Sequence, residues 1–228
     1  MMGSMTSGGF ETVLDYLTGE ILAGRVAAGG RLPNERELAA QLGASRSAVR
    51  EAIKVLQAQG VVTSAIGPSG GTRVGTGQGP AFGRMLKLHV ALEAVSFAEL
   101  TETRVVLERA AAIAAAVGGR SMAEVRRLAD AMVDVTDPAG FNELDTAFHL
   151  AIAAMGENRL IRDMTTAIRE AVAERILDAE ERLVDWEGLR RRLVAEHAGI
   201  VEALAVGDGA AAADLCEAHI RGAHEALG

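Results

Sequence analysis

The chain has 228 residues, of which 49% are hydrophobic and 3% aromatic, and its formal net charge is −8. This length can hold two modest domains, and the scarcity of aromatic residues favours helices packed through alanine, leucine and valine over sheets. No apolar run reaches the roughly 18 residues of a membrane helix, no secretory signal is present, and the single cysteine, Cys216, excludes an internal disulfide and a thiolate zinc cluster. We therefore expect a cytoplasmic protein without a membrane span.

The N-terminal part predicts three helices. Residues 10–23 form an amphipathic pattern that would brace the two shorter helices after it. Asn34 is placed to cap the second helix, and Gly43 supplies the left-handed residue that ends it. Ser45 then caps a third helix, which runs to Gly60. This spacing predicts a helix-turn-helix.

The third helix carries two separate stripes. One is apolar, at a spacing that fits burial: Val49, Ile53 and Leu56. The other is basic and polar: Arg46, Ser47, Arg50, Lys54 and Gln57. A helix of this kind after a tight turn is typical of a recognition helix for the DNA major groove. The alternative is a helical hairpin whose charged face is merely solvated.

A β-hairpin is expected directly after this helix. Residues 61–66 are β-branched and extended, residues 67–71 are rich in turn formers, and residues 72–74 return. Helix, turn, helix and hairpin together favour a winged helix-turn-helix over the solvated hairpin. A short glycine-rich linker over residues 75–80 follows.

The negative charge is unevenly distributed. Residues 1–77 carry seven basic and six acidic side chains, whereas the remainder carries 16 basic and 25 acidic ones. The acidic part should stay away from DNA. Because a net charge of +1 is weak for a monomeric DNA binder, we expect a homodimer that reads a palindromic operator in double-stranded DNA.

Residues 81–228 show only helical periodicity, which predicts one antiparallel all-α bundle. Ser121, Asp137 and Asp185 are placed to cap helices within it. The expected helices span residues 81–95, 97–117, 121–135, 138–155, 158–183, 185–206 and 209–226. The predicted fold class is thus mainly α, with the winged domain over residues 10–74 and the bundle over 81–228.

Three histidines fall on the inward faces of three different helices. His149 follows Asp145 by four residues, so both lie on one side of their helix. His197 and His219 lie on the apolar stripes of two later helices. If the four side chains converge, three neutral imidazoles and a carboxylate suit a divalent ion such as Zn²⁺, Ni²⁺ or Mn²⁺. Taken singly, each histidine fits a packed, hydrogen-bonded core residue better than a metal ligand. Three such histidines together with a carboxylate four residues before one of them favour a metal site.

Arg104 is an isolated cation on an otherwise apolar helix face. Such a residue needs a buried anion, and a carboxylate ligand bound by both guanidinium arms is a natural partner. The alternative is an ion pair with Glu108, four residues further on.

The N-terminal motifs resemble those of the GntR family of bacterial transcription regulators. The matching segments lie within residues 12–74 and are GRLP at 30–33, ERELA at 35–39, LGASRSAVREA at 42–52 and GTRV at 71–74. The resemblance implies DNA contacts from Arg36, Ser45, Arg46, Ser47, Arg50 and Gly71.

Residues 97–226 resemble the FCD ligand-binding domain of the FadR subfamily. The matching text includes ETR at 102–104, LE at 107–108, DTAFH at 145–149, EH at 196–197 and His219. The resemblance implies that the metal ligands are Asp145, His149, His197 and His219, and that Arg104 grips a carboxylate effector. Asn158 is assigned to the same pocket, although Glu157 is inserted before it relative to the family pattern.

The resulting hypothesis is a regulator without enzyme activity, a repressor released from its operator by a small organic acid at the metal site. A second hypothesis makes the ion itself the signal. A third is a metalloenzyme fused to a DNA-binding domain, for which Glu196, next to His197, would be the candidate base.

Overall fold

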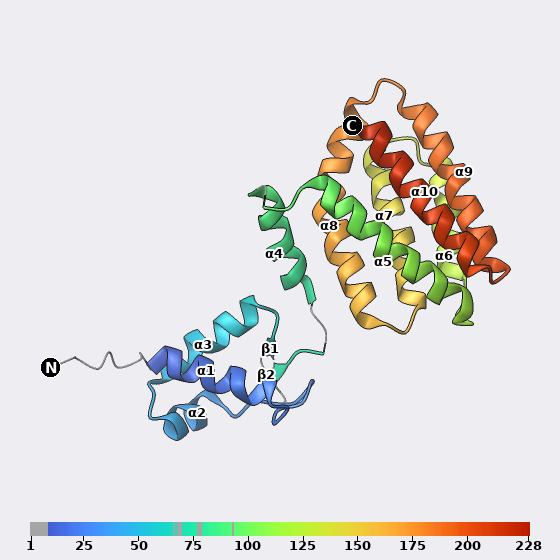
Figure 1. Ribbon diagram of the computed structural model, residues 1–228. Helices are drawn as coiled ribbons and strands as arrows, with labels where there is room; N and C mark the ends of the chain where they lie inside the picture. Colours follow the sequence, from blue (N-terminus) through green and yellow to red (C-terminus); the bar gives the residue numbers. More distant parts are fainter. Residues whose placement is uncertain (1–8, 66, 68–69, 77–78, 93) are drawn as a thin grey trace. The chain divides into compact units, whose positions relative to one another are not determined.

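The structure is a computed structural model that describes residues 9–65, 67, 70–76, 79–92 and 94–228. The described residues form ten helices and one two-stranded sheet, so the mainly α fold class predicted from the sequence is confirmed (Figure 1). The chain divides into two compact units between Phe82 and Gly83, and each unit is treated by itself. Within the described part, no helix is both long enough and apolar enough to cross a membrane.

The first unit is a winged helix-turn-helix. Its elements are α1 (Gly9–Leu22), α2 (Glu35–Leu42), α3 (Arg46–Ala58), β1 (Val62–Ala65) and β2 (Gly71–Val74). They share one apolar core, to which all five elements and the segment before α2 contribute. Residues buried in it include Val13, Leu17, Leu32, Leu38, Val49, Ala52, Ile53, Leu56, Val62 and Val74. Because α3 buries its apolar stripe in this core, its polar stripe remains outside.

Local capping determines where α2 and α3 begin and end. The Asn34 side chain accepts hydrogen bonds from the backbone N–H groups of Arg36 and Glu37, and the Glu37 side chain accepts one from the Asn34 N–H. Gly43 ends α2 in the left-handed conformation, with φ of 61°. Ser45 then caps α3 by accepting from the Ala48 N–H. The tight turn between the helices therefore follows from these few residues.

The wing is an antiparallel hairpin of β1 and β2, with Val62 opposite Val74. On the other edge of β2, the Leu32 N–H donates to the Thr72 carbonyl and the Val74 N–H donates to the Gly30 carbonyl. These bonds anchor the hairpin to the segment that precedes α2. Residues 66 and 68–69 of the expected strand and turn, and 77–78 of the expected linker, lie outside the described residues.

The second unit is a helical bundle. Its elements are α4 (Gly79–Ala91, within which the unit begins), α5 (Phe97–Val117), α6 (Ala123–Asp134), α7 (Pro138–Met155), α8 (Arg159–Arg182), α9 (Trp186–Ala205) and α10 (Gly209–Leu227). α5 packs against α10, α7 and α8, while α9 packs against α10 and α6. The main apolar core lies between α5, α6, α7, α9 and α10 (Figure 1). A second, smaller cluster joins Leu100 of α5 to Ile168 and Val172 of α8.

Most of the predicted caps of the bundle are present. The side chains of Asp137 and Asp185 accept from the N–H groups of Gly140 and Gly188 and so cap α7 and α9. Ser121 does not occupy the cap position of α6, which begins two residues later. Met122 is the capping residue and makes no side-chain bond, while the Ser121 hydroxyl accepts from the Ala123 N–H at 3.2 Å. The Ser121 hydroxyl thus still accepts from a backbone N–H at the start of α6, although Ser121 lies one residue before the cap position.

Candidate metal centre and nucleic-acid interface

The outward face of α3 presents the polar residues at its N-terminal turn. Ser45, Arg46, Ser47 and Arg50 are all exposed. The hydroxyls of Ser45 and Ser47 lie 2.9 Å apart, and the Ser45 hydroxyl also accepts from the Ala48 N–H. The helix N-terminus and two hydroxyls are therefore presented together, and helix N-termini favour anions such as backbone phosphates.

The arginines on and beside this face differ in whether they already have an ion-pair partner. Arg50 is held by Glu35, to which its Nε and Nη2 atoms donate at 3.1 and 2.7 Å. Arg36 and Arg46 are exposed and form no ion pair with any residue that the structure describes. The guanidinium groups of Arg36 and Arg46 are thus available for an external anion. To bind such an anion, Arg50 would have to leave Glu35 or contact both groups.

Gly71 begins β2 with a φ of 122°. A Cβ atom there would lie 2.9 Å from Nε of Arg31, whose guanidinium covers the glycine. A larger residue would thus be strained in its backbone and would displace Arg31.

In the bundle, four side chains from three helices converge. Asp145 and His149 lie on α7, His197 on α9 and His219 on α10. One potential ligand atom from each lies within 4.8 Å of all the others. The Nε2 atoms of His149, His197 and His219 lie 3.7, 3.0 and 3.5 Å from Oδ1 of Asp145.

This arrangement fits a divalent metal ion. The three histidines are at most 2% exposed, yet Nε2 of His149 and both ring nitrogens of His197 make no hydrogen bond with a described residue. Buried polar atoms without partners are rare and call for an explanation. Three imidazole nitrogens and one carboxylate oxygen form a donor set suited to Zn²⁺ and similar ions. An ion among these atoms would satisfy Nε2 of His149 and one of the two ring nitrogens of His197.

Two of the imidazoles are oriented from behind by carboxylates. Nδ1 of His149 lies 2.7 Å from Oε2 of Glu108, and Nδ1 of His219 lies 2.8 Å from Oε2 of Glu196. A carboxylate at Nδ1 favours the tautomer whose Nε2 lone pair is available to a metal. Glu196 thus contacts the ring nitrogen opposite the ligand atom, which weakens its case as a general base.

A fully buried arginine joins the two inner carboxylates. Arg169 on α8 donates from Nε and Nη2 to Glu108, at 2.9 and 2.6 Å, and from Nη1 to Oδ2 of Asp145, at 2.6 Å. Asp145 therefore has one oxygen engaged by the guanidinium, while the other faces the imidazoles. Sequence reasoning missed Arg169, although a lone arginine beside the apolar Ile168 and Val172 on a buried face is the same signal that identified Arg104.

Burial and charge set the protonation states. Burial lowers the pKa of His149 to about 3 and that of His197 to about 4, so both rings are neutral. Burial alone would raise the pKa of Glu108 and Asp145, but Arg169 and the neighbouring imidazoles outweigh it and hold both well below their usual range. Burial would also lower the pKa of His219, but Asp145 and Glu196 raise it.

A small cavity adjoins the cluster. Its volume is about 20 Å³, roughly the room of one water molecule. Polar residues from four helices contribute to its wall: Arg104, Asp145, Glu180, His219 and His224. The rest of the wall is apolar: Phe97, Ile176, Leu193, Ala223 and Leu227.

The two residues expected to contact an effector have different places. Arg104 lines the cavity and also pairs through Nε with Glu108 at 3.3 Å, so both of its expected partners are compatible with the structure. Asn158 does not line the cavity. It is exposed and caps α8, where its side chain accepts from the N–H groups of Leu160 and Ile161.

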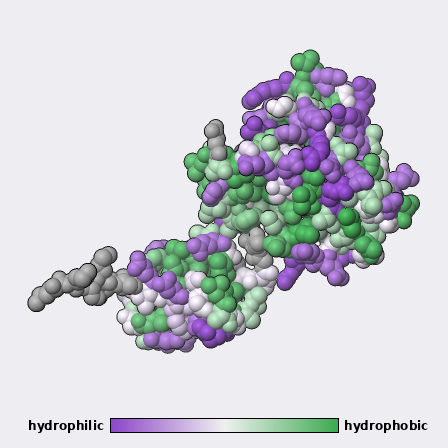
Figure 2. Space-filling view, in the orientation of Figure 1, coloured by the Kyte–Doolittle hydropathy of each residue, from purple (hydrophilic) through white to green (hydrophobic). Residues whose placement is uncertain are grey.

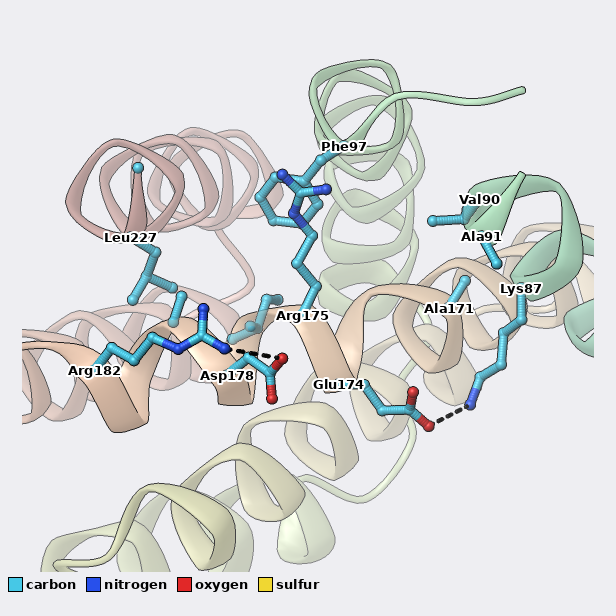
Figure 3. Close-up of a pocket in the computed structure, with 13 residues that line it drawn as sticks. Lys87, Val90, Ala91, Phe97, Ala171, Glu174, Arg175, Asp178, Arg182 and Leu227 are labelled. Carbon is cyan, nitrogen blue, oxygen red and sulfur yellow. Dashed lines mark ion pairs between the residues drawn. The ribbon is translucent and has the colours of Figure 1, made fainter. Parts of the chain in front are cut away.

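A larger hollow of about 550 Å³ lies between α4, α8, the start of α5 and the end of α10 (Figure 3). Its cations already have partners within the wall. Lys87 lies 3.7 Å from Glu174, Arg182 lies 3.6 Å from Asp178, and Arg175 stacks over the ring of Phe97 at 4.8 Å. The small cavity, unlike this hollow, combines buried charged groups with metal-ligand atoms.

Comparisons with known proteins match both units of the chain to protein families. Residues 10–74 match the gntR family of bacterial regulatory proteins, and residues 99–222 match the FCD domain. LutR, an HTH-type transcriptional regulator of Bacillus subtilis, is 29% identical over 90% of this chain and 94% of its own. An Escherichia coli protein named for regulation of the L-lactate dehydrogenase operon is 27% identical over 95% of this chain and 85% of its own. The solved structure of Streptococcus agalactiae GntR is similar in fold, with a TM-score of 0.57, 22% identity, and coverage of 95% of this chain and 99% of that one.

Proposed function

Because the chain belongs to the gntR family of bacterial regulatory proteins and carries an FCD domain over more than half of its length, we propose that it controls transcription in response to a small organic acid. Family membership makes it a DNA-binding transcription regulator. The sense of control is repression, relieved when the acid binds at a metal site in the bundle. Such a protein acts in the cytoplasm, where its operator is.

Operator contacts come from the exposed face of α3 and its surroundings. The residues that we assign to DNA are Arg36, Ser45, Arg46, Ser47, Arg50 and Gly71. The assignment is supported by the exposure of Arg36, Ser45, Arg46, Ser47 and Arg50 and by the absence of ion pairs at Arg36 and Arg46 among the described residues. Gly71 is half-buried beneath Arg31, and its assignment follows from the family resemblance. Arginine at base edges confers specificity, whereas hydroxyls and helix N-termini position the protein on phosphates.

The regulator acts as a homodimer on a palindromic operator, with half-sites about one helical turn apart. One support is the nearly balanced charge of the DNA-binding unit, which gives a single copy little electrostatic affinity. Another is an exposed apolar stripe on α5, where Val106, Ile113 and Val117 are 68%, 47% and 80% exposed. Hydrophobic areas also appear among hydrophilic ones on the bundle surface in Figure 2.

Asp145, His149, His197 and His219 hold the divalent ion, which is Zn²⁺, Ni²⁺ or Mn²⁺. The observation that carries this assignment is the convergence of four ligand atoms within 4.8 Å, with buried nitrogens that have no other partner. When bound, the ion supplies positive charge and open coordination positions to an anionic ligand. The protein's own charges nearby, Arg104 and Arg169 against Glu108 and Asp145, cancel. Glu180 adds no charge near pH 7, because burial raises its pKa to about 8. A divalent ion therefore leaves the site positive and favours a carboxylate.

Arg104 is the protein group that grips the carboxylate of the effector. Its Nε atom is engaged by Glu108, while the guanidinium lines the cavity beside Asp145 and His219. The name of the Escherichia coli relative makes lactate a sensible first acid to test. Binding shifts the balance between two arrangements of the DNA-binding units, which requires a differential affinity of a few kcal/mol.

The decisive experiment measures operator affinity with and without the acid. A duplex selected from a random-sequence pool by the Zn²⁺-loaded protein serves as the operator, and Arg46→Ala serves as the variant that binds DNA poorly. We expect lactate or a related acid to weaken operator binding by wild type. If no carboxylate changes the operator affinity, the acid-sensing half of the proposal is wrong. The DNA-binding half of the proposal would still hold.

A second candidate function makes the ion the signal. The small volume of the cavity favours it, because about 20 Å³ admits an ion or a water molecule more readily than an organic acid. On this reading, chelation alone changes operator affinity at metal levels found in cells. A metal that only stabilises the bundle would instead lower the melting temperature on removal and leave operator affinity unchanged.

A further inference from the structure

Glu180 is a buried acidic residue with no role in the metal cluster or the DNA interface. It lies on α8, eleven residues after Arg169 and on the same inward face as Val172 and Ile176. It is 3% exposed and lines the small cavity together with Arg104. Its Oε2 atom makes no hydrogen bond with any described residue.

This carboxyl lacks the kind of partner that the other buried acids have. Glu108 and Asp145 are paired with Arg169, whereas no ion pair to Glu180 is found among the described residues. Burial, together with repulsion from Asp145, raises the pKa of Glu180 to about 8, although a hydrogen bond with Asn142 acts in the opposite direction. A buried polar atom left unpaired is costly, so the Oε2 atom is placed to pair with a water molecule in the cavity or with a ligand atom that replaces this water.

The cavity thus offers three kinds of contact. Arg104, with the metal-ligand pair Asp145 and His219, provides the charged side. Glu180 provides an unpaired oxygen. The remaining wall is mostly apolar, and suits a short hydrocarbon group: Phe97, Ile176, Leu193, Ala223 and Leu227.

We propose that Glu180 is a specificity-determining residue that selects organic acids carrying a hydroxyl group. The inference rests on the proposed function, since it names the class of acid that the bundle senses. The acid's carboxylate meets Arg104, and its hydroxyl donates a hydrogen bond to the Glu180 carboxyl. Charged or neutral, that carboxyl has an oxygen that accepts the bond, so the selection does not depend on its proton.

Entry of the acid requires the cavity to widen. In the present conformation it has room for about one water molecule. His224 and Leu227, in the last turns of α10, are half-buried members of its wall. Their outward displacement would enlarge the cavity, and it would break the contacts of His224 with Phe97 and Thr101 of α5.

Matched pairs of acids test the selection. Calorimetric titration of the full-length, Zn²⁺-loaded protein compares lactate with propionate, and 2-hydroxybutyrate with butyrate. We expect wild type to bind each hydroxy acid about tenfold or more tightly than its parent acid, the value of one hydrogen bond to a buried polar group. Glu180→Leu should weaken the hydroxy acid until both members of a pair bind alike. Glu180→Gln should keep a preference, because its amide oxygen still accepts.

Controls separate specificity from folding. The next residue, Glu181, is exposed, and Glu181→Leu should leave the preference unchanged. Metal content and melting temperature identify a variant that fails to fold, in which case Glu180→Ala replaces Glu180→Leu. An unchanged preference in the folded Leu or Ala variant, or equal binding of both acids by wild type, overturns the role of Glu180 and leaves acid sensing intact. If wild type binds none of the acids, both this inference and the proposed effector class fall.

Discussion

Replacing Arg169 by methionine tests whether the buried charges form one balanced network. The guanidinium is 1% exposed and donates three hydrogen bonds, two to Glu108 and one to Asp145. Arg169→Met would leave the buried carboxylate of Glu108 and the half-buried one of Asp145 without their principal counter-charge, which costs about 3–5 kcal/mol. In a domain of this size, that loss lowers the melting temperature by about 6–20 °C.

The pH dependence of this loss is also predictable. Arg169 outweighs the effect of burial and holds the pKa of Glu108 and Asp145 below their usual range. Their contribution to stability is therefore present above the unfolded-state pKa of about 4 and is lost as pH falls through the folded-state pKa. The difference between wild type and Arg169→Met should be large near pH 7 and should shrink as the pH falls below about 4.

Denaturant unfolding of metal-free protein at several pH values is the assay. Arg182→Met is the matched control on the same helix, because Arg182 is 80% exposed at the side chain and its pair with Asp178 is long, at 3.6 Å. That exposed pair should contribute less than about 1 kcal/mol. If Arg169→Met loses no more stability at pH 7 than Arg182→Met, the network does not hold the site as described.

Further predictions concern DNA, metal and pH. Arg46→Ala should weaken operator binding by about 1–3 kcal/mol, measured by fluorescence anisotropy, with an unchanged melting temperature of the bundle. Added Zn²⁺ should raise the melting temperature of wild type, and His197→Ala should abolish this stabilisation. Glu196→Gln should reduce Zn²⁺ affinity about 10–100-fold in chelator competition. Because the pKa of His219 is raised, a proton competes with the metal there, so Zn²⁺ affinity should fall as pH drops through that raised value. A pH-independent affinity between pH 5 and 8 would contradict this competition.

Much of the fold was predictable because its signals are local. The capping residues Asn34, Asp137 and Asp185 lie within three residues of the N–H groups that they accept from. Helical periodicity is also a local signal, because it depends on residues within a few turns of each other. It predicted α5 and α7 with their observed bounds. The start of α6 differed by two residues from its predicted place because the Ser121 hydroxyl can also serve from outside the helix.

The candidate site was only partly predictable. Asp145 and the histidines could be placed on inward faces, because each lies at a fixed angle from apolar neighbours on its own helix. Asn158 was expected in the effector pocket from its place in the family motif. Its side chain instead caps α8 and contacts backbone N–H groups there.

The sequence alone determined the helix-turn-helix, the helical bundle and the faces on which the histidines lie, since these follow from interactions within four residues along the chain. Tertiary structure decided which buried charges meet. Arg169 reaches Glu108 across 61 positions of sequence and Asp145 across 24, and Glu180 is left with an unpaired oxygen. These pairings depend on how three helices are packed and which rotamers fit between them, and no periodicity within a single helix contains that information.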